Sequence, residues 1–161
     1  MTNSDFGGSA NGGAGNDLLF GSNDPFAFST LDGGAGNDAL QAGTGGGYLI
    51  GADGKDLLRG ADGNDYMSGG TGVDRFVFGE VWSASTFSGD SISDFEDGVE
   101  KIDLRGTGLT FEDLTIENVD YGSFAYATIT NETAGFIEVR AAYDENFVSR
   151  VVLDRGDFLF G

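Results

Sequence analysis

GGAGNDLLF, at residues 12–20, is the stretch that decides the fold, because close copies of it recur at a fixed spacing. The copies are residues 33–41 (GGAGNDALQ), 51–59 (GADGKDLLR), 60–68 (GADGNDYMS) and 69–77 (GGTGVDRFV). Each unit of nine residues has glycines within its first four places, an aspartate at the sixth and an apolar residue at the eighth. This repeated pattern is typical of a calcium-binding parallel β-roll.

The chemistry of the unit explains its pattern. Glycine tolerates positive φ and close backbone approach, so the first half of each unit can form a tight turn. Carboxylate and carbonyl oxygens are hard ligands that suit Ca²⁺. The last three residues predict a short strand whose eighth-place side chain points inward. The expected inward set is Leu19, Leu31, Leu40, Leu49, Leu58, Met67 and Phe76.

The spacing also predicts where calcium binds. If two units make one turn, alternate units stack, and one side carries the sixth-place residues Asp17, Asp38, Asp56 and Asp74. The other side carries Ser29, Gly47 and Asp65, so its column is incomplete. An ion between stacked turns would be shared by both, which predicts two or three sites on the aspartate side and none to two on the other. The turn glycines expected to contribute are Gly13, Gly15, Gly34, Gly36, Gly54, Gly63 and Gly72.

Other acids are open to two interpretations. Asp53 and Asp62, third in their units, are either additional ligands or solvated side chains. Asp90, Asp94 and Asp103 either close one more calcium site against the last loop or form a solvated rim. With these included, the sequence predicts about 3 to 6 calcium ions per chain.

Composition limits the function. The formal net charge of −19 argues against nucleic acids and anionic membranes as partners. The chain has no Cys and no His, which excludes thiolate chemistry, a Ser-His-Asp triad and the usual zinc sites, so no catalytic residues are predicted. Stacked carboxylates repel one another without calcium, and metal binding then contributes folding free energy. We therefore expect a calcium-dependent folding switch.

The second half of the chain has a different composition. Twenty-one of the 29 glycines precede residue 80, and aromatic and β-branched residues follow. We predict an all-β protein with two regions that make one continuous unit, a parallel β-roll (a right-handed β-helix) over 1–78 and an antiparallel, sandwich-like cap over 79–161. Expected cap elements are a single helical turn at 110–114 and strands near 114–119, 124–130, 136–142 and 147–154.

These motifs resemble RTX (hemolysin-type) calcium-binding repeats. The run 74–78 (DRFVF), followed by residues 90–104 (DSISDFEDGVEKIDL), is similar to the segment after the repeats in serralysin-type metalloproteases and in the R-modules of mannuronan C5-epimerases. The chain departs from that pattern at Ser29 and Gly47, and at Glu100, where aspartate is usual.

The resemblance implies a secreted, extracellular protein exported by a type I machine that reads an uncleaved C-terminal signal. Residues 157–161 (DFLFG) are similar to such a signal, and a last edge strand is the other interpretation. The start of the chain has no Sec-type signal, and no run of 18 apolar residues could span a membrane. Low cytosolic calcium would keep the chain unfolded for export, and calcium outside would fold it.

Three functions remain open. The first is a non-catalytic calcium-folding module. The second is an accessory module of a larger enzyme, such as an epimerase or a metalloprotease, that binds an alginate-like anionic polysaccharide. Tyr48, Ile50 and Tyr66 could form its platform, although the repeat half has only Lys55, Arg59 and Arg75 as cations. The third is a structural module of an adhesin or surface layer. Arg140 and Arg150 are either salt-bridged or polysaccharide contacts.

Overall fold

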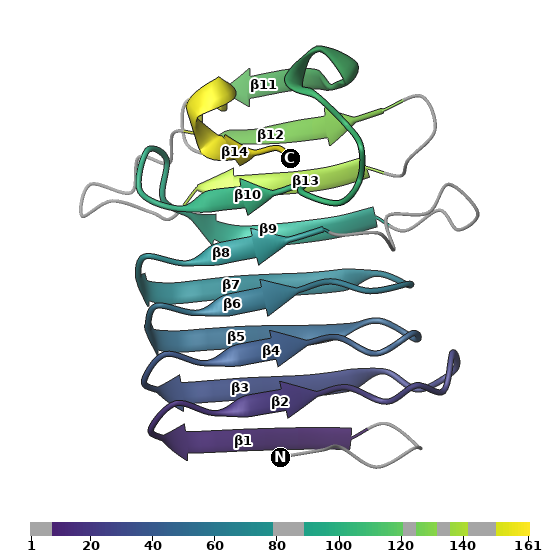
Figure 1. Ribbon diagram of the computed structural model, residues 1–161, viewed down its shortest axis with the longest axis vertical. Coiled ribbons are helices and arrows are strands. Elements are labelled where there is room, and N and C mark those ends of the chain that lie inside the picture. Colours follow the sequence, from purple (N-terminus) through teal and green to yellow (C-terminus); the bar gives the residue numbers. More distant parts are fainter. Residues whose placement is uncertain (1–7, 79–88, 121–124, 132–135, 142–150) are drawn as a thin grey trace.

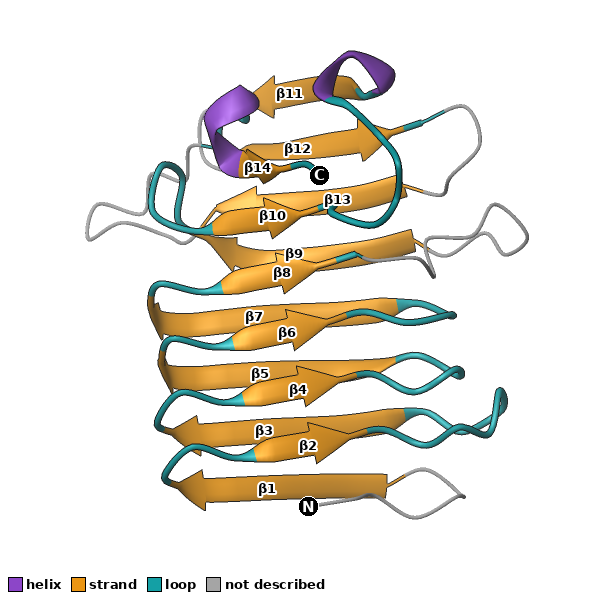
Figure 2. Ribbon diagram, viewed as in Figure 1, coloured by secondary structure: helices purple, strands orange, loops and turns teal. Residues whose placement is uncertain are grey.

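The computed structural model describes residues 8–78, 89–120, 125–131, 136–141 and 151–161. The repeats form a parallel β-solenoid of about four turns, with each turn made of one long and one short strand (Figure 1). The long strands lie in one sheet and the short strands in another, and the two sheets face each other across the core (Figure 2). The predicted all-β roll is thereby confirmed.

The long sheet has eight strands in the order β1-β3-β5-β7-β9-β13-β12-β11. Its roll strands are β1 (Gly8–Ala14), β3 (Ser29–Ala35), β5 (Gly47–Gly54), β7 (Asp65–Gly72) and β9 (Gly89–Phe95). The short sheet has the order β14-β10-β8-β6-β4-β2. Its strands are β2 (Leu18–Phe20), β4 (Ala39–Gln41), β6 (Leu57–Arg59), β8 (Arg75–Val77), β10 (Lys101–Asp103) and β14 (Phe158–Leu159).

The core is a stack of the predicted inward residues. On the short sheet, Leu40 pairs in register with Leu58, and Leu58 with Phe76. These partners are 18 residues apart, which confirms that two units make one turn. All seven residues of the expected inward set are 0–1% exposed. Because each apolar side chain lies directly above the next, the repeats bury one continuous core.

The strands of the two sheets differ in length, which the repeat pattern did not predict. The short-sheet strands within the repeats have three residues, as expected, but the long-sheet strands continue through the glycine-rich half of the next unit and reach seven or eight residues. Glycine permits this close pairing. Gly36 has φ of +139°, and a Cβ there would collide with the carbonyl oxygen of Gly15 in the turn below.

The cap extends the long sheet. Strands β11 (Thr115–Asp120), β12 (Ala125–Thr130) and β13 (Phe136–Ala141) pair antiparallel, as predicted. Strand β13 then pairs in parallel with β9, so the cap covers the end of the long sheet without a break. In the expected strand near 147–154, residues 147–150 lie outside the described part of the chain, and 151–154 do not form a strand.

Helical structure is limited to two short 3-10 turns within the described residues. The first, η1 (Phe111–Asp113), has Thr110 as its N-cap and confirms the expected single turn. The second, η2 (Arg155–Asp157), leads into β14 at the end of the chain. Strand β14 pairs in parallel with β10 and is the edge of the short sheet, so the terminal residues do form an edge strand. No helix of the described residues has the length and hydropathy to cross a membrane.

Candidate metal centres

Asp17, Asp38, Asp56 and Asp74 form a column along one side of the roll, where each immediately precedes a short strand. We call these four residues the aspartate column. The Oδ1 atom of Asp38 accepts a hydrogen bond from the backbone N–H of Asp17 at 2.7 Å. Asp56 and Asp74 accept in the same way from the residue one turn earlier, at 2.7 and 2.8 Å. Backbone N–H groups of neighbouring turns therefore hold the carboxylates of the column in place.

The second oxygen of each column carboxylate has no partner. Oδ2 of Asp17, Asp38, Asp56 and Asp74 is buried and makes no hydrogen bond, and the same is true of Oδ1 of Asp65. All five atoms belong to sixth-place aspartates of the repeats. Among the described residues, the only other buried side-chain atom in this condition is Nε of Arg75. Burying a polar group without a partner lowers the stability of the fold, and a cation bound to these oxygens would compensate for that cost.

The surroundings of these oxygens fit calcium. A Cβ at Gly12 would lie only 2.7 Å from Asp17 Oδ2, and one at Gly69 only 2.5 Å from Asp74 Oδ2. The first-place glycine therefore leaves open the space beside the free oxygen. Among the described residues, no three acids are close enough to enclose a metal by themselves. An ion in a gap of the column would therefore use two carboxylates together with backbone carbonyls of the turns, which Ca²⁺ accepts readily.

Burial makes the charged form of these acids unfavourable. Desolvation, followed by the charges of Asp74 and Asp38, raises the pKa of Asp56 to about 6. Burial likewise raises the pKa of Asp74. A bound divalent cation would reverse this effect, because it stabilises the ionised carboxylates.

The other side of the roll has a shorter acidic column. Here Ser29, Gly47, Asp65 and Asp90 are aligned on successive long strands. Ser29 already accepts a hydrogen bond from the N–H of Ser22 at 3.0 Å, and Gly47 has no side chain. Only Asp65 and Asp90 face each other as carboxylates, with Asp90 Oδ1 accepting from the N–H of Asp65 at 2.9 Å. Burial raises their pKa values to about 8 and about 7.

The three acids after the repeats do not come together. Asp90 and Asp94 lie four residues apart on the extended strand β9, a separation of about 13 Å. Asp103 lies on the short sheet, where Arg105 binds it at 2.6 Å and Arg75 at 3.6 Å. The hydrogen bond from Arg105 lowers the Asp103 pKa. The expected single site from these three acids is therefore wrong, because an extended strand and an ion pair separate them.

The third-place acids lie outside the column. Asp53 is exposed and accepts a hydrogen bond from the hydroxyl of Thr71 on the neighbouring strand at 2.9 Å. Asp62 is half-buried, in the loop before β7. The turn glycine of that unit, Gly63, has φ of +96°, and a Cβ there would collide with the backbone of Gly46.

One acid that the sequence did not predict as a ligand follows the four-residue aspartate column along the same line. Glu100 immediately precedes β10 and stacks above Asp74. It lies two residues before the inward Ile102, just as Asp74 lies two residues before the inward Phe76. That spacing is the signal that could have identified it. Burial raises the Glu100 pKa to about 8.

The outer face of the long sheet carries aromatic side chains. The ring of Tyr48 lies 5.1 Å from the tilted ring of Tyr66 and meets the ring of Phe28 edge-on, also at 5.1 Å, measured between ring centroids. Both tyrosines are more than 40% exposed, so the described cap residues leave the expected platform open. A groove of about 540 Å³ lies beside it and is bordered by Phe136 and Arg140. Arg140 pairs with Glu138 at 2.6 Å, which favours the salt-bridge interpretation; Arg150 lies outside the described residues.

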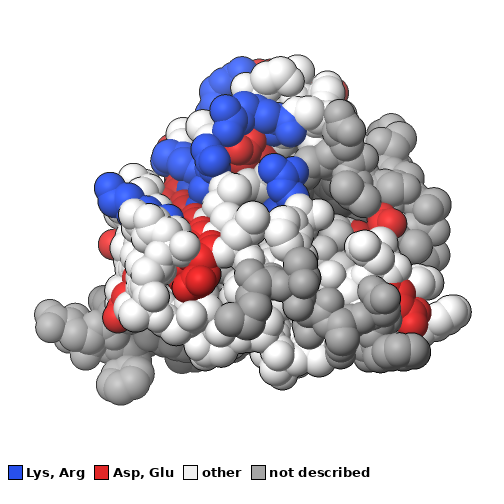
Figure 3. Space-filling view, turned by 60° about the horizontal axis from the view of Figure 1, so that its bottom comes forward, with Lys and Arg blue, Asp and Glu red and all other residues white. Residues whose placement is uncertain are grey.

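The outer face of the short sheet gathers positive charge (Figure 3). Arg75 and Lys101 are neighbours in register on β8 and β10, and Arg59 lies on the adjacent strand β6, two residues beyond Leu57, the partner of Arg75. Lys55 and Arg105 lie next to these strands, and Lys55 lines the same shallow hollow as Arg75 and Lys101. Five of the eight Lys and Arg residues of this acidic chain thus share one face.

Lowering the pH should restore part of the native-state stability that the protein loses when calcium is chelated. Buried Asp56, Asp65, Asp90 and Glu100 have pKa values raised to between about 6 and about 8. A raised folded-state pKa means that the native chain holds these protons more tightly than the unfolded chain. Their contribution to stability is therefore full below about pH 4 and is lost as the pH rises towards 8.

The measurement is the urea midpoint in chelator as a function of pH, followed by circular dichroism. We expect a urea midpoint near pH 4 to 5 that falls as the pH rises, until at pH 8 the chelated chain is unfolded without urea. Calcium-saturated protein is the control and should show the opposite trend, because protons compete with the metal. A chelated chain that gains stability with rising pH would contradict the assignment of these carboxyl groups as buried and uncompensated.

The comparisons with known proteins agree with this geometry. Residues 8–155 match the family model described as "Peptidase M10 serralysin C terminal". No curated protein sequence matches the chain. The solution structure of the AlgE6R3 subunit from the Azotobacter vinelandii mannuronan C5-epimerase is similar, with a TM-score of 0.53, 22% identity, and 92% of this chain and 80% of that chain covered. The AlgE6R2 subunit gives a TM-score of 0.48 and 25% identity, covering 94% of this chain and 91% of that one.

Proposed function

The chain belongs to the Peptidase M10 serralysin C-terminal family, and from this we propose that it is a non-catalytic RTX module of a secreted protein that folds on binding calcium outside the cell. Membership of this family makes it a calcium-binding repeat module. The observation that supports the proposal most directly is the set of five buried carboxylate oxygens without partners, all at the sixth place of the repeat.

We assign the ligands as follows. Three ions lie in the gaps of the aspartate column, between Asp17 and Asp38, Asp38 and Asp56, and Asp56 and Asp74. Each gap also uses turn carbonyls, from the set Gly13, Gly15, Gly34, Gly36, Gly54 and Gly72. A further ion lies between Asp65 and Asp90, near the turn of Gly63. When bound, calcium supplies the positive charge that lets these buried carboxylates stay ionised.

The difference in calcium concentration between the cytosol and the outside of the cell controls when the module folds. Extracellular modules bind calcium at roughly 10⁻⁴ to 10⁻³ M, far above cytosolic levels. The chain therefore stays open for passage through a type I export machine and folds after it. Residues 157–161 serve as the export signal before folding and as the edge of the short sheet after it. Asp157 is buried in the folded state, so the signal is readable only in the unfolded chain.

Export through a type I machine should depend on the terminal apolar residues. In cells that carry such an exporter, we expect the chain in the medium, and a Phe158→Ala/Leu159→Ala/Phe160→Ala variant retained inside. A Val151→Ala/Leu153→Ala variant is the matched control, because it also removes buried apolar side chains close to the terminus. Equal export of all three proteins, measured as the secreted fraction, would contradict the signal.

A second candidate function, an accessory module that binds an anionic polysaccharide, is supported by the positive face of the short sheet (Figure 3). The sequence shows only scattered cations, but the fold places Arg59, Arg75 and Lys101 on three adjacent strands. Adjacent strands lie about 4.8 Å apart, so Arg75 and Lys101, which are in register, lie close enough to contact neighbouring carboxylates of a polyanion.

Polyuronate binding in calcium buffer would test this candidate. An Arg59→Ala/Lys101→Ala variant should bind immobilised polyuronate at least roughly tenfold more weakly. The control is Arg155→Ala, which removes an exposed cation that pairs with Glu112 and is not one of the five cations of this face. No binding by the parent chain, or equal binding by the double variant, would exclude the positive face as the polysaccharide site.

A further inference from the structure

A row of aromatic side chains on the outer face of the long sheet stops at β9. Tyr48 and Tyr66 are partners in register on β5 and β7, and Ser91 is the partner of Tyr66 on β9. The two tyrosine rings lie 5.1 Å apart between centroids. Ser91 has no ring with which to continue the row, and it lines the groove of about 540 Å³. A groove of this size is typical of a site for a small ligand.

Small residues of β9 leave the groove open. Gly89, Ser91 and Ser93 line it and are alternate residues of one strand, so they lie on the same face of the sheet. A Cβ at Gly89 would come within 2.5 Å of the Phe136 ring, so the glycine makes room for that ring. Phe136 is exposed on β13, which lies on the other side of β9 from Tyr66. Aromatic side chains therefore border the groove on both sides.

The polar groups of the groove include hydroxyls and one pair of opposite charges. Glu138 on β13 is the in-register partner of Ser91, and Arg140 binds Glu138 at 2.6 Å. Both charged residues line the groove, and their charges compensate each other. Hydroxyl, carboxylate and guanidinium groups together offer hydrogen-bond donors and acceptors.

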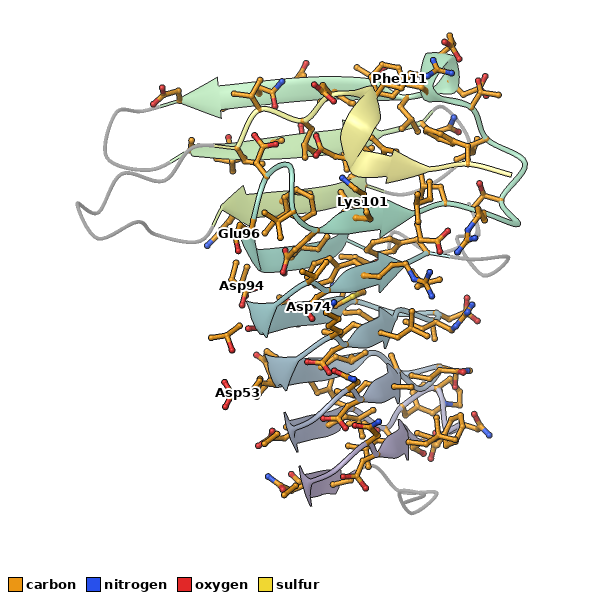
Figure 4. The ribbon with its side chains drawn as sticks, turned by 60° about the vertical axis from the view of Figure 1, so that its left-hand side comes forward. Asp53, Asp74, Asp94, Glu96, Lys101 and Phe111 are labelled. Carbon is orange, nitrogen blue, oxygen red and sulfur yellow. The ribbon has the colours of Figure 1, made fainter. Side chains whose placement is uncertain are left out.

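The acids of the neighbouring strands do not make the groove negative. Asp90 belongs to β9, but its carboxylate is buried and accepts from the N–H of Asp65 at 2.9 Å. Asp53 and Asp94 do not line the groove. They lie near the ends of β5 and β9, as Figure 4 shows. The groove is therefore an aromatic and uncharged site on an acidic chain.

These features fit the chemistry of a sugar ring. A pyranose has an apolar C–H face, which packs on an aromatic ring, and a rim of hydroxyl groups, which need both donors and acceptors. A second copy of the chain fits less well, because two molecules with a net charge of −19 each repel one another. The groove is lined by residues of the adjacent strands β5, β7, β9 and β13, so it suits an extended chain of sugars.

We propose that this groove binds an uncharged, β-1,4-linked polysaccharide. Tyr66 and Phe136 provide the aromatic contacts, and Ser91, Glu138 and Arg140 provide the polar ones. The β-1,4 linkage of glucose or mannose has equatorial bonds at both ends, which gives the extended chain. The site goes beyond the proposed calcium function and needs it only for a folded roll. It lies on the other sheet from the positive face, so it is separate from the candidate polyuronate site.

The test is isothermal titration calorimetry in calcium buffer with cellohexaose and mannohexaose. We expect at least one of them to bind, and maltohexaose, which coils because of its α-1,4 linkages, to bind at least roughly tenfold more weakly. Tyr66→Ala removes an aromatic wall, and Ser91→Tyr fills the groove with a ring; each should weaken binding at least roughly tenfold. The matched control is Phe26→Ala, which removes a ring that is 96% exposed and does not line the groove.

The outcomes separate this site from the calcium function, because circular dichroism of each sample shows whether calcium has folded the chain. A parent chain that folds with calcium but binds neither β-linked hexaose would overturn the site alone. Equal binding by the parent and Ser91→Tyr chains would overturn the assignment of the groove. A dimer that Ser91→Tyr abolishes, without any glycan binding, would assign the groove to a second copy and also overturn the proposal.

Discussion

Calcium added to the chelated chain at pH 8 should produce a cooperative rise in β-structure at sub-millimolar to millimolar concentration. Without the metal, the column Asp17, Asp38, Asp56 and Asp74 places like charges on successive turns, and each has one buried oxygen without a partner. With a net charge of −19 and 29 glycines, the unfolded chain is the favoured state until cations occupy the gaps.

The titration is followed by far-ultraviolet circular dichroism, with magnesium as the control. Magnesium keeps its water shell and demands octahedral geometry, so it should not fold the chain at the same concentration. Because the gaps share aspartates, binding in one orders the next, and we expect a Hill coefficient above one. A chain that is already folded in chelator and indifferent to calcium would refute the switch.

The sequence was sufficient to predict the roll because its signals are local and repeated. The nine-residue period places Leu40, Leu58 and Phe76 in one stack, and it places the column aspartates two residues before them. Both results depend only on spacing and on the alternation of a strand. Each copy adds an independent observation of the same geometry, so a single degenerate unit, such as the one with Ser29, does not change the outcome.

Beyond the repeat, the sequence predicted the single turn and three of the strands but not the long-range pairing. The parallel pairing of β13 with β9 joins residues 46 or 47 positions apart, and no local period encodes it. Asp90, Asp94 and Asp103 are close in sequence, and their separation became clear only once β9 was known to be extended and Asp103 to pair with Arg105. The gathering of Arg59, Arg75 and Lys101 likewise depends on strand register, which composition does not reveal.

Removing one charge from the middle of the column should have opposite effects with and without calcium. Asp56 borders two gaps, and the Asp56→Asn variant retains an oxygen that can accept from the N–H of Asp38. In chelator, we expect the variant to be more stable than the parent chain at pH 8, since burial and the neighbouring acids raise the Asp56 pKa to about 6. The gain is about 1 kcal/mol once solvent screening is allowed for.

In the presence of calcium, we expect the parent chain to be more stable than the Asp56→Asn variant. The same variant loses one ionised ligand from two gaps, so the calcium midpoint for folding should rise by roughly tenfold or more. The matched control is Asp32→Asn on β3, an acid outside the column that accepts from the side chain of Asn11. The measurements are folding induced in chelator by the osmolyte trimethylamine N-oxide, because the chelated chain is unfolded at pH 8, and a calcium titration of each variant. Lower stability of Asp56→Asn in both conditions would show that the carboxylate has a structural role independent of metal, and the column would then lose its assignment as the calcium site.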